Sequence, residues 1–162
     1  HIRDALIRKF PEVRERFSPL RMIDHVPLSS EVNDSMSILH KKKKVRRKVC
    51  QYGSLAQVSL QSSHPIEISV EKEPHSSIMY RAIHDKVIQK EGICRICPSF
   101  YGSEYGIFRN LLYPLLSLSK QDMLQIAIKY KFDDILRLTW SCWYPRNGHP
   151  CQQCDMCRER II

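Results

Sequence analysis

The stretch TWSCWYPRNGHPCQQCDMCR, residues 139–158, holds four cysteines with the spacing C-x8-C-x2-C-x2-C. A tetrahedral zinc ion takes four thiolates at about 2.3 Å, and a C-x2-C step lets two thiolates point at one ion. Two such steps share the middle cysteine, and the eight-residue loop contains two prolines and a glycine that favour a turn back. We therefore predict a structural zinc knuckle over residues 139–160, with these ligands: Cys142, Cys151, Cys154 and Cys157.

Alternatives to this zinc site stay open at the level of sequence. The four cysteines could be unligated thiols, or they could hold an iron–sulfur cluster, since cysteines two residues apart suit both kinds of site. His149 lies inside the loop and competes with Cys142 as a ligand. A further C-x2-C pair, Cys94 and Cys97, is either a second minor thiol site, a redox couple or incidental.

Length, composition and cysteine count set the class of protein. The chain has 162 residues, of which 43% are hydrophobic and 27% charged, which is typical of one globular domain, so we expect a single domain over residues 1–162. No apolar run approaches the roughly 20 residues that span a bilayer, and the N-terminus lacks the apolar core of a signal peptide. The odd total of seven cysteines disfavours a disulfide framework. We therefore expect a cytoplasmic protein without a membrane partner.

The net charge of +9 comes mostly from one segment. Residues Lys41 to Lys48 carry seven positive charges among eight residues, and the rest of the chain is close to neutral. Such a run is either a solvated loop or a contact with phosphate in a nucleic acid or nucleotide. The run is thus a candidate site for nucleic acid.

Apolar periodicity predicts a mixture of helices and strands, which favours an α/β layer. Pro11 is expected to split or kink the first helix, Ser119 to cap the last one, and Gly92 to end the helix before it. The polar residues 29–37 and the Tyr-, Ser- and Gly-rich residues 98–106 are expected to be loops. The predicted helices are 2–17, 76–91 and 119–132, the predicted strands are 21–28 and 66–70, and residues 135–140 are a short strand or a turn.

Three segments near the C-terminus carry a resemblance to a known family. They are LYPLLSLSK at residues 112–120, TWSC at residues 139–142, and the C-x2-C-x2-C-R-x-R run at residues 151–160. Together they resemble the C-terminal part of the 7-cyano-7-deazaguanine synthases, which belong to the ATP pyrophosphatase (PP-loop) superfamily. The resemblance covers about fifty residues, roughly 112–160.

The resemblance implies a fold and a reaction. The fold is a Rossmann-like parallel α/β sheet layer with the zinc knuckle appended. The reaction converts 7-carboxy-7-deazaguanine to the nitrile preQ0, with ATP and magnesium, for queuosine or for deazaguanine modification of nucleic acid. The implied partner is a small deazapurine, and a homodimer is a candidate assembly. Tyr101, Tyr105 and Arg109 flank a loop that is a candidate lining for a purine-like pocket.

One motif of that family is not found in this chain. Its ATP loop needs Ser-Gly-Gly-x-Asp-Ser, because glycines let backbone amides approach a pyrophosphate. The nearest similar stretch is Ser30–Ser35, where Glu31 and Val32 stand in place of the glycines. We therefore expect catalysis only where the missing ATP loop is supplied. The alternative is a non-catalytic, zinc-stapled basic module that binds nucleic acid or a protein partner.

Overall fold

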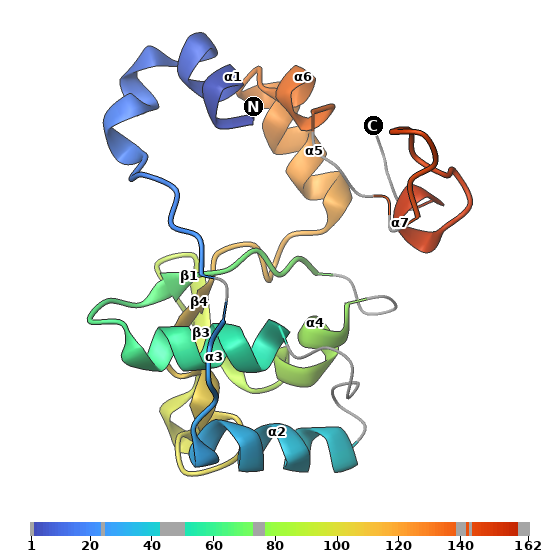
Figure 1. The fold of residues 1–162 in the computed structure, drawn as a ribbon. Helices are drawn as coiled ribbons and strands as arrows, with labels where there is room; N and C mark the ends of the chain where they lie inside the picture. The colour runs from blue at the N-terminus through green and yellow to red at the C-terminus, as the bar shows by residue number, and fades with distance from the viewer. Residues whose placement is uncertain are drawn as a thin grey trace. The chain divides into compact units, whose positions relative to one another are not determined.

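The computed structural model describes residues 2–23, 25–42, 51–72, 77–138, 142 and 144–158 (Figure 1). Its contacts divide the chain into two compact units. We call residues 1–21 with 120–162 the terminal unit and residues 22–119 the central unit. The expectation of a single domain stays a prediction. None of the helices among the described residues is long and apolar enough to cross a bilayer.

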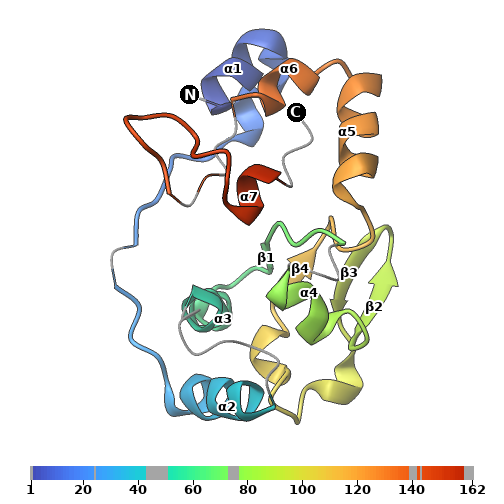
Figure 2. The same ribbon diagram turned by 90° about the vertical axis from the view of Figure 1, so that its right-hand side faces the viewer.

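Short helices build the terminal unit, and its first break confirms the expectation at Pro11. Helix α1 ends before this proline, which begins the 3-10 helix η1 because its ring fixes φ and suits a first helical position. Figures 1 and 2 both place α1 beside α6, where Lys9 and Asp134 form an ion pair of 2.5 Å. The elements are α1 (Ile2–Lys9), η1 (Pro11–Arg16), α5 (Lys120–Lys129), α6 (Asp133–Leu136) and α7 (Asp155–Arg158).

Two expectations for this unit have opposite outcomes. Helix α5 starts directly after Ser119, as the predicted cap requires. The strand or turn expected over residues 135–140 is wrong at its start, because Asp133–Leu136 is helical. Residues 137 and 138 form a turn, as the prediction allowed, and residues 139 and 140 lie outside the described chain.

The central unit contains a four-stranded sheet in the order β1-β4-β3-β2, so the predicted α/β class is confirmed. The sheet is mixed and not the parallel layer that the resemblance implied. Only β1 and β4 are parallel, with Ile66 opposite Leu111, while the pairs β2–β3 and β3–β4 are antiparallel. The strands are β1 (Ile66–Glu67), β2 (Val87–Lys90), β3 (Ile93–Ile96) and β4 (Leu111–Tyr113).

A tight turn explains why the sheet is mixed. Glu91 and Gly92 have φ of 53° and 82°, the left-handed values that a two-residue hairpin turn requires. The helix predicted over residues 76–91 therefore ends early, as α4 (Ile78–Ile83), and its last residues become β2. Gly92 serves the hairpin and does not cap a helix. Val87 and Ile88 fit a helical spacing in sequence, but β-branched side chains also favour strands.

Two further expectations for the central unit are wrong. Of residues 21–28, those that the structure describes form no strand. The expected loop at residues 29–37 lies mostly in α2 (Ser30–Lys41), because the Ser29 hydroxyl accepts the Val32 amide at 3.4 Å and caps the helix. Helix α3 (Gln51–Gln61) also forms where the sequence had suggested no helix.

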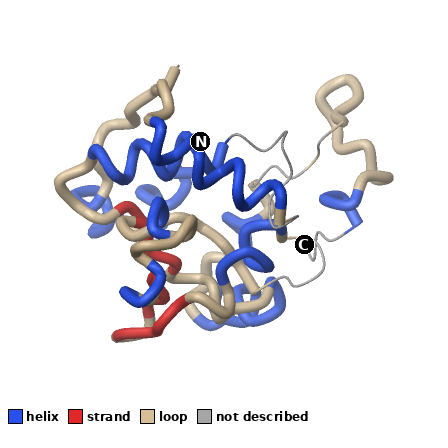
Figure 3. Tube along the Cα trace, turned by 90° about the horizontal axis from the view of Figure 1, so that it is seen from below, coloured by secondary structure: helices blue, strands red, loops and turns tan. Residues whose placement is uncertain are grey.

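The core of the central unit joins one face of the sheet to helices and 3-10 turns. Figure 3 shows how little of the trace is strand and how much is helix and loop. Short strands such as these need side-chain burial against helices for stability. The largest fully buried side chains here are Tyr113, Phe108, Leu39, Met79, Ile83, Ile96, Ile107 and Leu111.

Gly106 gives a test of this packing. A Cβ on Gly106 would lie 2.1 Å from the carbonyl oxygen of Tyr101, so alanine forces the backbone to shift. We expect Gly106→Ala to lower the free energy of unfolding by about 2 kcal/mol, the usual cost of overpacking. Gly102 is the matched control, because nothing lies within 4 Å of the Cβ that alanine would add there. Equal stability of the two variants in thermal or urea unfolding would contradict the packing described here.

Candidate metal centre

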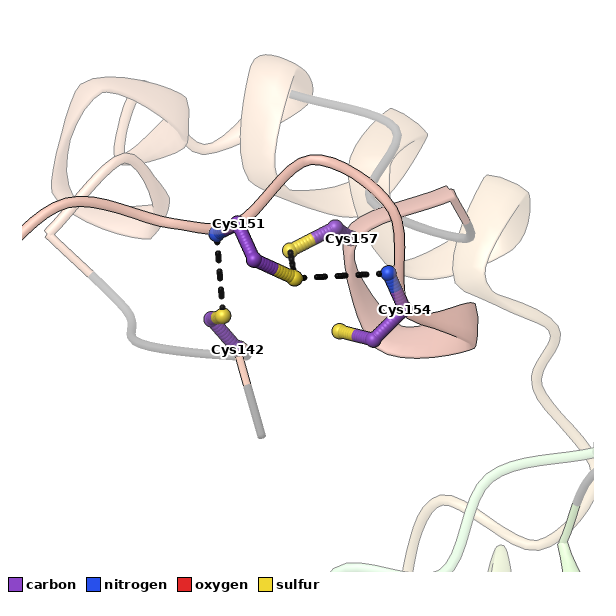
Figure 4. A group of neighbouring side chains, drawn as sticks. All are labelled: Cys142, Cys151, Cys154 and Cys157. Atoms are coloured by element: carbon purple, nitrogen blue, oxygen red, sulfur yellow. Dashed lines mark hydrogen bonds between the residues drawn. The ribbon is translucent and has the colours of Figure 1, made fainter. Parts of the chain in front are cut away.

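The structure brings the four cysteines of the C-terminal segment together. The Sγ atoms of Cys142, Cys151, Cys154 and Cys157 all lie within 4.8 Å of one another (Figure 4). Around a tetrahedral ion with metal–sulfur bonds of about 2.3 Å, the sulfurs stand about 3.8 Å apart. The Sγ atoms of Cys151 and Cys157 lie 4.0 Å apart. The four thiols, which we call the four-cysteine site, thus have the spacing of a mononuclear metal centre.

A tight turn folds the eight-residue loop back on itself. Arg146 and His149 exchange two backbone hydrogen bonds of 2.9 Å. Between them Asn147 and Gly148 have φ of 48° and 76°. Asn-Gly is the favoured pair for this kind of turn, because both positions need a left-handed backbone. The turn reverses the chain and brings Cys151 back to Cys142.

Backbone amides point at the sulfurs, as expected where thiolates form. The Cys151 amide donates to the Cys142 Sγ at 3.1 Å, and the Cys154 amide donates to the Cys151 Sγ at 3.4 Å. Gln152 has a φ of 60°, which lets the chain turn tightly around the Cys151 sulfur. The short helix α7 then carries Cys157 to the site. N–H donors of this kind stabilise the charged form of a sulfur.

The sulfurs do not ionise alike. Backbone hydrogen bonds from Gln153 and Cys154 lower the pKa of Cys151 to about 6. Desolvation and the neighbouring thiols raise the pKa of Cys157 to about 12. One thiolate therefore forms at neutral pH while its neighbour keeps its proton, because amide donors stabilise the first charge and desolvation opposes the second. Only a bound cation removes that penalty, so the donor set fits a soft metal ion such as zinc.

The structure bears on two alternatives to the zinc site that the sequence left open, an iron–sulfur cluster and His149 as a ligand. In an iron–sulfur cluster the four cysteines are divided among two or four irons, so at least some of their sulfurs stand farther apart than around a single ion. The group of close ligands found among the described residues contains the four cysteines and does not include the exposed His149. That a metal binds here stays a prediction at this point.

The second cysteine pair lies in the central unit. Cys94 is 6% exposed and packs in the core, where burial raises the pKa of its thiol. Cys97 contacts the Ser99 hydroxyl at 3.0 Å, and this hydrogen bond lowers the pKa of Cys97. Neither belongs to the ligand group found among the described residues. Cys94 and Cys97 thus belong to the central unit, whereas the four-cysteine site belongs to the terminal unit.

Other candidate residues fall outside any site seen in the described chain. Of the basic run, Lys41 ends α2 and Lys42 pairs with Glu104 at 2.7 Å, whereas residues 43–48 lie outside the described residues. Among the pocket candidates, Tyr105 is buried in the core, while Tyr101 is exposed. Arg109 donates to Glu31 at 2.8 Å. The structure thus gives Tyr105 a packing role and Arg109 an ion-pair role.

These features define an α/β protein with a C-terminal four-thiol centre. Residues 104–161 match the family model described as "Queuosine biosynthesis protein QueC". Residues 104–161 are therefore similar to the QueC family of 7-cyano-7-deazaguanine synthases, which confirms the resemblance seen in the sequence. No solved structure matches the chain.

Curated relatives agree with this assignment over the same length of chain. A 7-cyano-7-deazaguanine synthase of Nautilia profundicola is 44% identical over 48 residues, which is 30% of this chain and 20% of that protein. Synthases of Prochlorococcus marinus strain MIT 9515 and of its subspecies pastoris are 45% and 49% identical over 47 and 49 residues, each 29% of this chain and 20% of the relative. The match thus spans about a fifth of the length of these relatives.

Removal of one ligand tests the four-cysteine site. We expect Cys154→Ser to lose its zinc and to loosen residues 142–158, since binding free energy at a structural zinc is also folding free energy. Zinc per chain, measured by plasma mass spectrometry, should fall from about one to near zero. Cys97→Ser is the matched control and should keep its zinc. A Cys154→Ser variant with unchanged zinc content and melting temperature would show that the ligands are wrongly assigned.

The protonation pattern predicts how zinc affinity depends on pH. Zinc binds thiolates, so at neutral pH the raised pKa of Cys157 means that binding expels a proton there, whereas Cys151 is already ionised. Lowering the pH favours the thiols and must weaken binding. The one proton that leaves Cys157 makes the affinity fall about tenfold per pH unit between roughly pH 8 and pH 6.5. Competition with a chromogenic chelator measures this slope, and a flat profile would contradict proton displacement.

Proposed function

We propose that the four-cysteine site binds one structural zinc ion and that the chain acts as the C-terminal part of a 7-cyano-7-deazaguanine synthase-like protein. The observation that carries the proposal is the convergence of four Sγ atoms within 4.8 Å, in a segment that matches the QueC family model. Each feature alone is weaker, because close thiols occur in several classes of protein and the match covers only residues 104–161.

The proposed role of zinc follows from the ligand count. Four thiolates complete a tetrahedral ion and leave no position open for water or substrate. Such an ion stabilises a fold and does not activate a nucleophile. Zinc would therefore fix the segment from Cys142 to Cys157, whose short turns and four-residue helix are too small to be stable by burial alone.

The reaction itself is the finer part of the proposal. It is the ATP-dependent conversion of 7-carboxy-7-deazaguanine to the nitrile, in queuosine synthesis or deazaguanine modification of nucleic acid. ATP, magnesium and a small deazapurine are the proposed cofactors and substrate, and the chain carries no Ser-Gly-Gly-x-Asp-Ser loop for the nucleotide. Catalysis is thus proposed for an assembly in which that loop is supplied, in a cytoplasmic protein with a homodimer as its candidate assembly.

A chimera tests this function directly. Residues 104–161 would replace the matching segment of the Nautilia profundicola synthase, and nitrile formation would be followed by chromatography with ATP, magnesium and ammonia. We expect about one zinc per chimera and a rate within about tenfold of the parent, which is about 1.4 kcal/mol of transition-state stabilisation.

Two controls make the chimera decisive. The unaltered parent enzyme sets the reference rate, and the chimera with Cys154→Ser should lose both zinc and activity. A chimera that folds and holds zinc but forms no nitrile would contradict the proposed role of this segment.

The second candidate function is a non-catalytic module that binds nucleic acid through Lys41 to Lys48. The observation that favours it is helix α2, which occupies the stretch nearest to an ATP loop, Ser30–Ser35. Phosphate contacts release counterions, so such binding weakens steeply with salt. RNA or DNA binding by the zinc-loaded chain with a steep salt dependence, together with an inactive chimera, would favour this module.

A further inference from the structure

Two sulfurs of the four-cysteine site are already in contact. The Sγ atoms of Cys151 and Cys157 lie 4.0 Å apart, and Figure 4 draws them pointing at each other. A disulfide needs about 2.05 Å between the sulfurs. Closing this gap requires side-chain rotation and a small shift of helix α7. This helix has only four residues, so few backbone hydrogen bonds hold it in place.

Exposure separates this pair from the first cysteine of the site. Cys142 is buried, with 8% of its surface exposed, whereas Cys151, Cys154 and Cys157 are half-buried. A small oxidant from solvent therefore reaches the half-buried sulfurs first. The contact between the Cys151 and Cys157 sulfurs, together with their access to solvent, makes this pair the candidate for oxidation.

We propose that the four-cysteine site is a peroxide-sensitive zinc switch, in which Cys151 and Cys157 form a disulfide and the metal is released. The inference rests on the zinc binding proposed above and adds a regulatory role to it. The oxidant is a hydroperoxide, of which hydrogen peroxide is the simplest.

The chemistry balances in two steps. The Cys151 thiolate attacks one peroxide oxygen, so an S–O bond forms, the O–O bond breaks, and the hydroxide that leaves takes up a proton to become water. The Cys157 thiolate then attacks the Cys151 sulfur, the S–S bond forms, and the second hydroxide leaves and also becomes water. The two sulfurs lose two electrons and the peroxide gains them.

Release of the metal follows from the loss of ligands. A disulfide sulfur is neutral and a poor zinc ligand, so zinc keeps only Cys142 and Cys154 of its four thiolates. These two take up protons as the ion leaves, since the metal no longer compensates their charge. The segment from Cys142 to Cys157 then loses the ion that fixes it. Reduction by a dithiol reverses the step, and zinc can bind again.

Peroxide titration of the zinc-loaded chain tests the proposal. Released zinc is read with a chromogenic chelator, and the intact mass, measured without reductant, should fall by two hydrogen masses. After blocking the remaining thiols, cleavage before Asp155 separates Cys157 from the peptide that carries Cys142, Cys151 and Cys154. We expect about one zinc released per disulfide and a cross-linked peptide pair in which Cys142 and Cys154 are blocked. Cys97→Ser is the matched control and should behave as the parent.

The outcomes separate this inference from the proposed function. The switch would be overturned if the chain keeps its zinc when its thiols outside the four-cysteine site are fully oxidised. It would also be overturned if the disulfide joins a different pair of cysteines. Neither result would contradict the zinc site itself. A chain that binds no zinc contradicts the proposed function and with it zinc release, whereas the peptide map of that chain still shows whether Cys151 and Cys157 pair. A Cys157→Ser variant that forms the same mass loss would also overturn the assigned pair.

Discussion

Mutual repulsion among four sulfurs is the constraint on which the C-terminal segment depends. Four Sγ atoms within 4.8 Å of one another would repel strongly as thiolates without a cation, and desolvation adds to this cost by raising the pKa of Cys157. The Asn147-Gly148 turn and the amide–sulfur contacts give the four thiols the spacing that a single ion requires. A small segment without a core of its own can gain folding free energy from the binding of such an ion.

The central unit follows a different principle, because its stability comes from burial. Its strands are two to four residues long, too short to form a stable sheet alone. Phe108 and Tyr113 are fully buried, and Gly106 permits a backbone approach that no side chain would allow. Ion pairs at its surface, such as that between Arg109 and Glu31, contribute little by comparison, since exposed pairs are screened by water.

The sequence predicted the local features better than the long-range pairings. The cysteine spacing, the break at Pro11 and the start of α5 after Ser119 depend on neighbouring residues, and the structure places each as expected. The mixed sheet depends on the hairpin at Glu91-Gly92, where both residues have a left-handed backbone. Glu is not among the residues that usually occupy the first position of such a turn, so the sequence did not indicate it. The Asn-Gly pair at residues 147–148 was a visible signal for the turn that closes the metal centre.

Helix α2 bears on nucleotide binding by this chain. A phosphate loop needs amides that are free to donate and space for negative charge. In α2 the Val32 amide donates to the Ser29 hydroxyl, and the carboxylate of Glu31 accepts from Arg109. In the stretch Ser30–Ser35, the Val32 amide and the Glu31 carboxylate thus already have partners within the protein. This arrangement is that of a capped helix and not of a phosphate loop, and the family model matches the chain at residues 104–161.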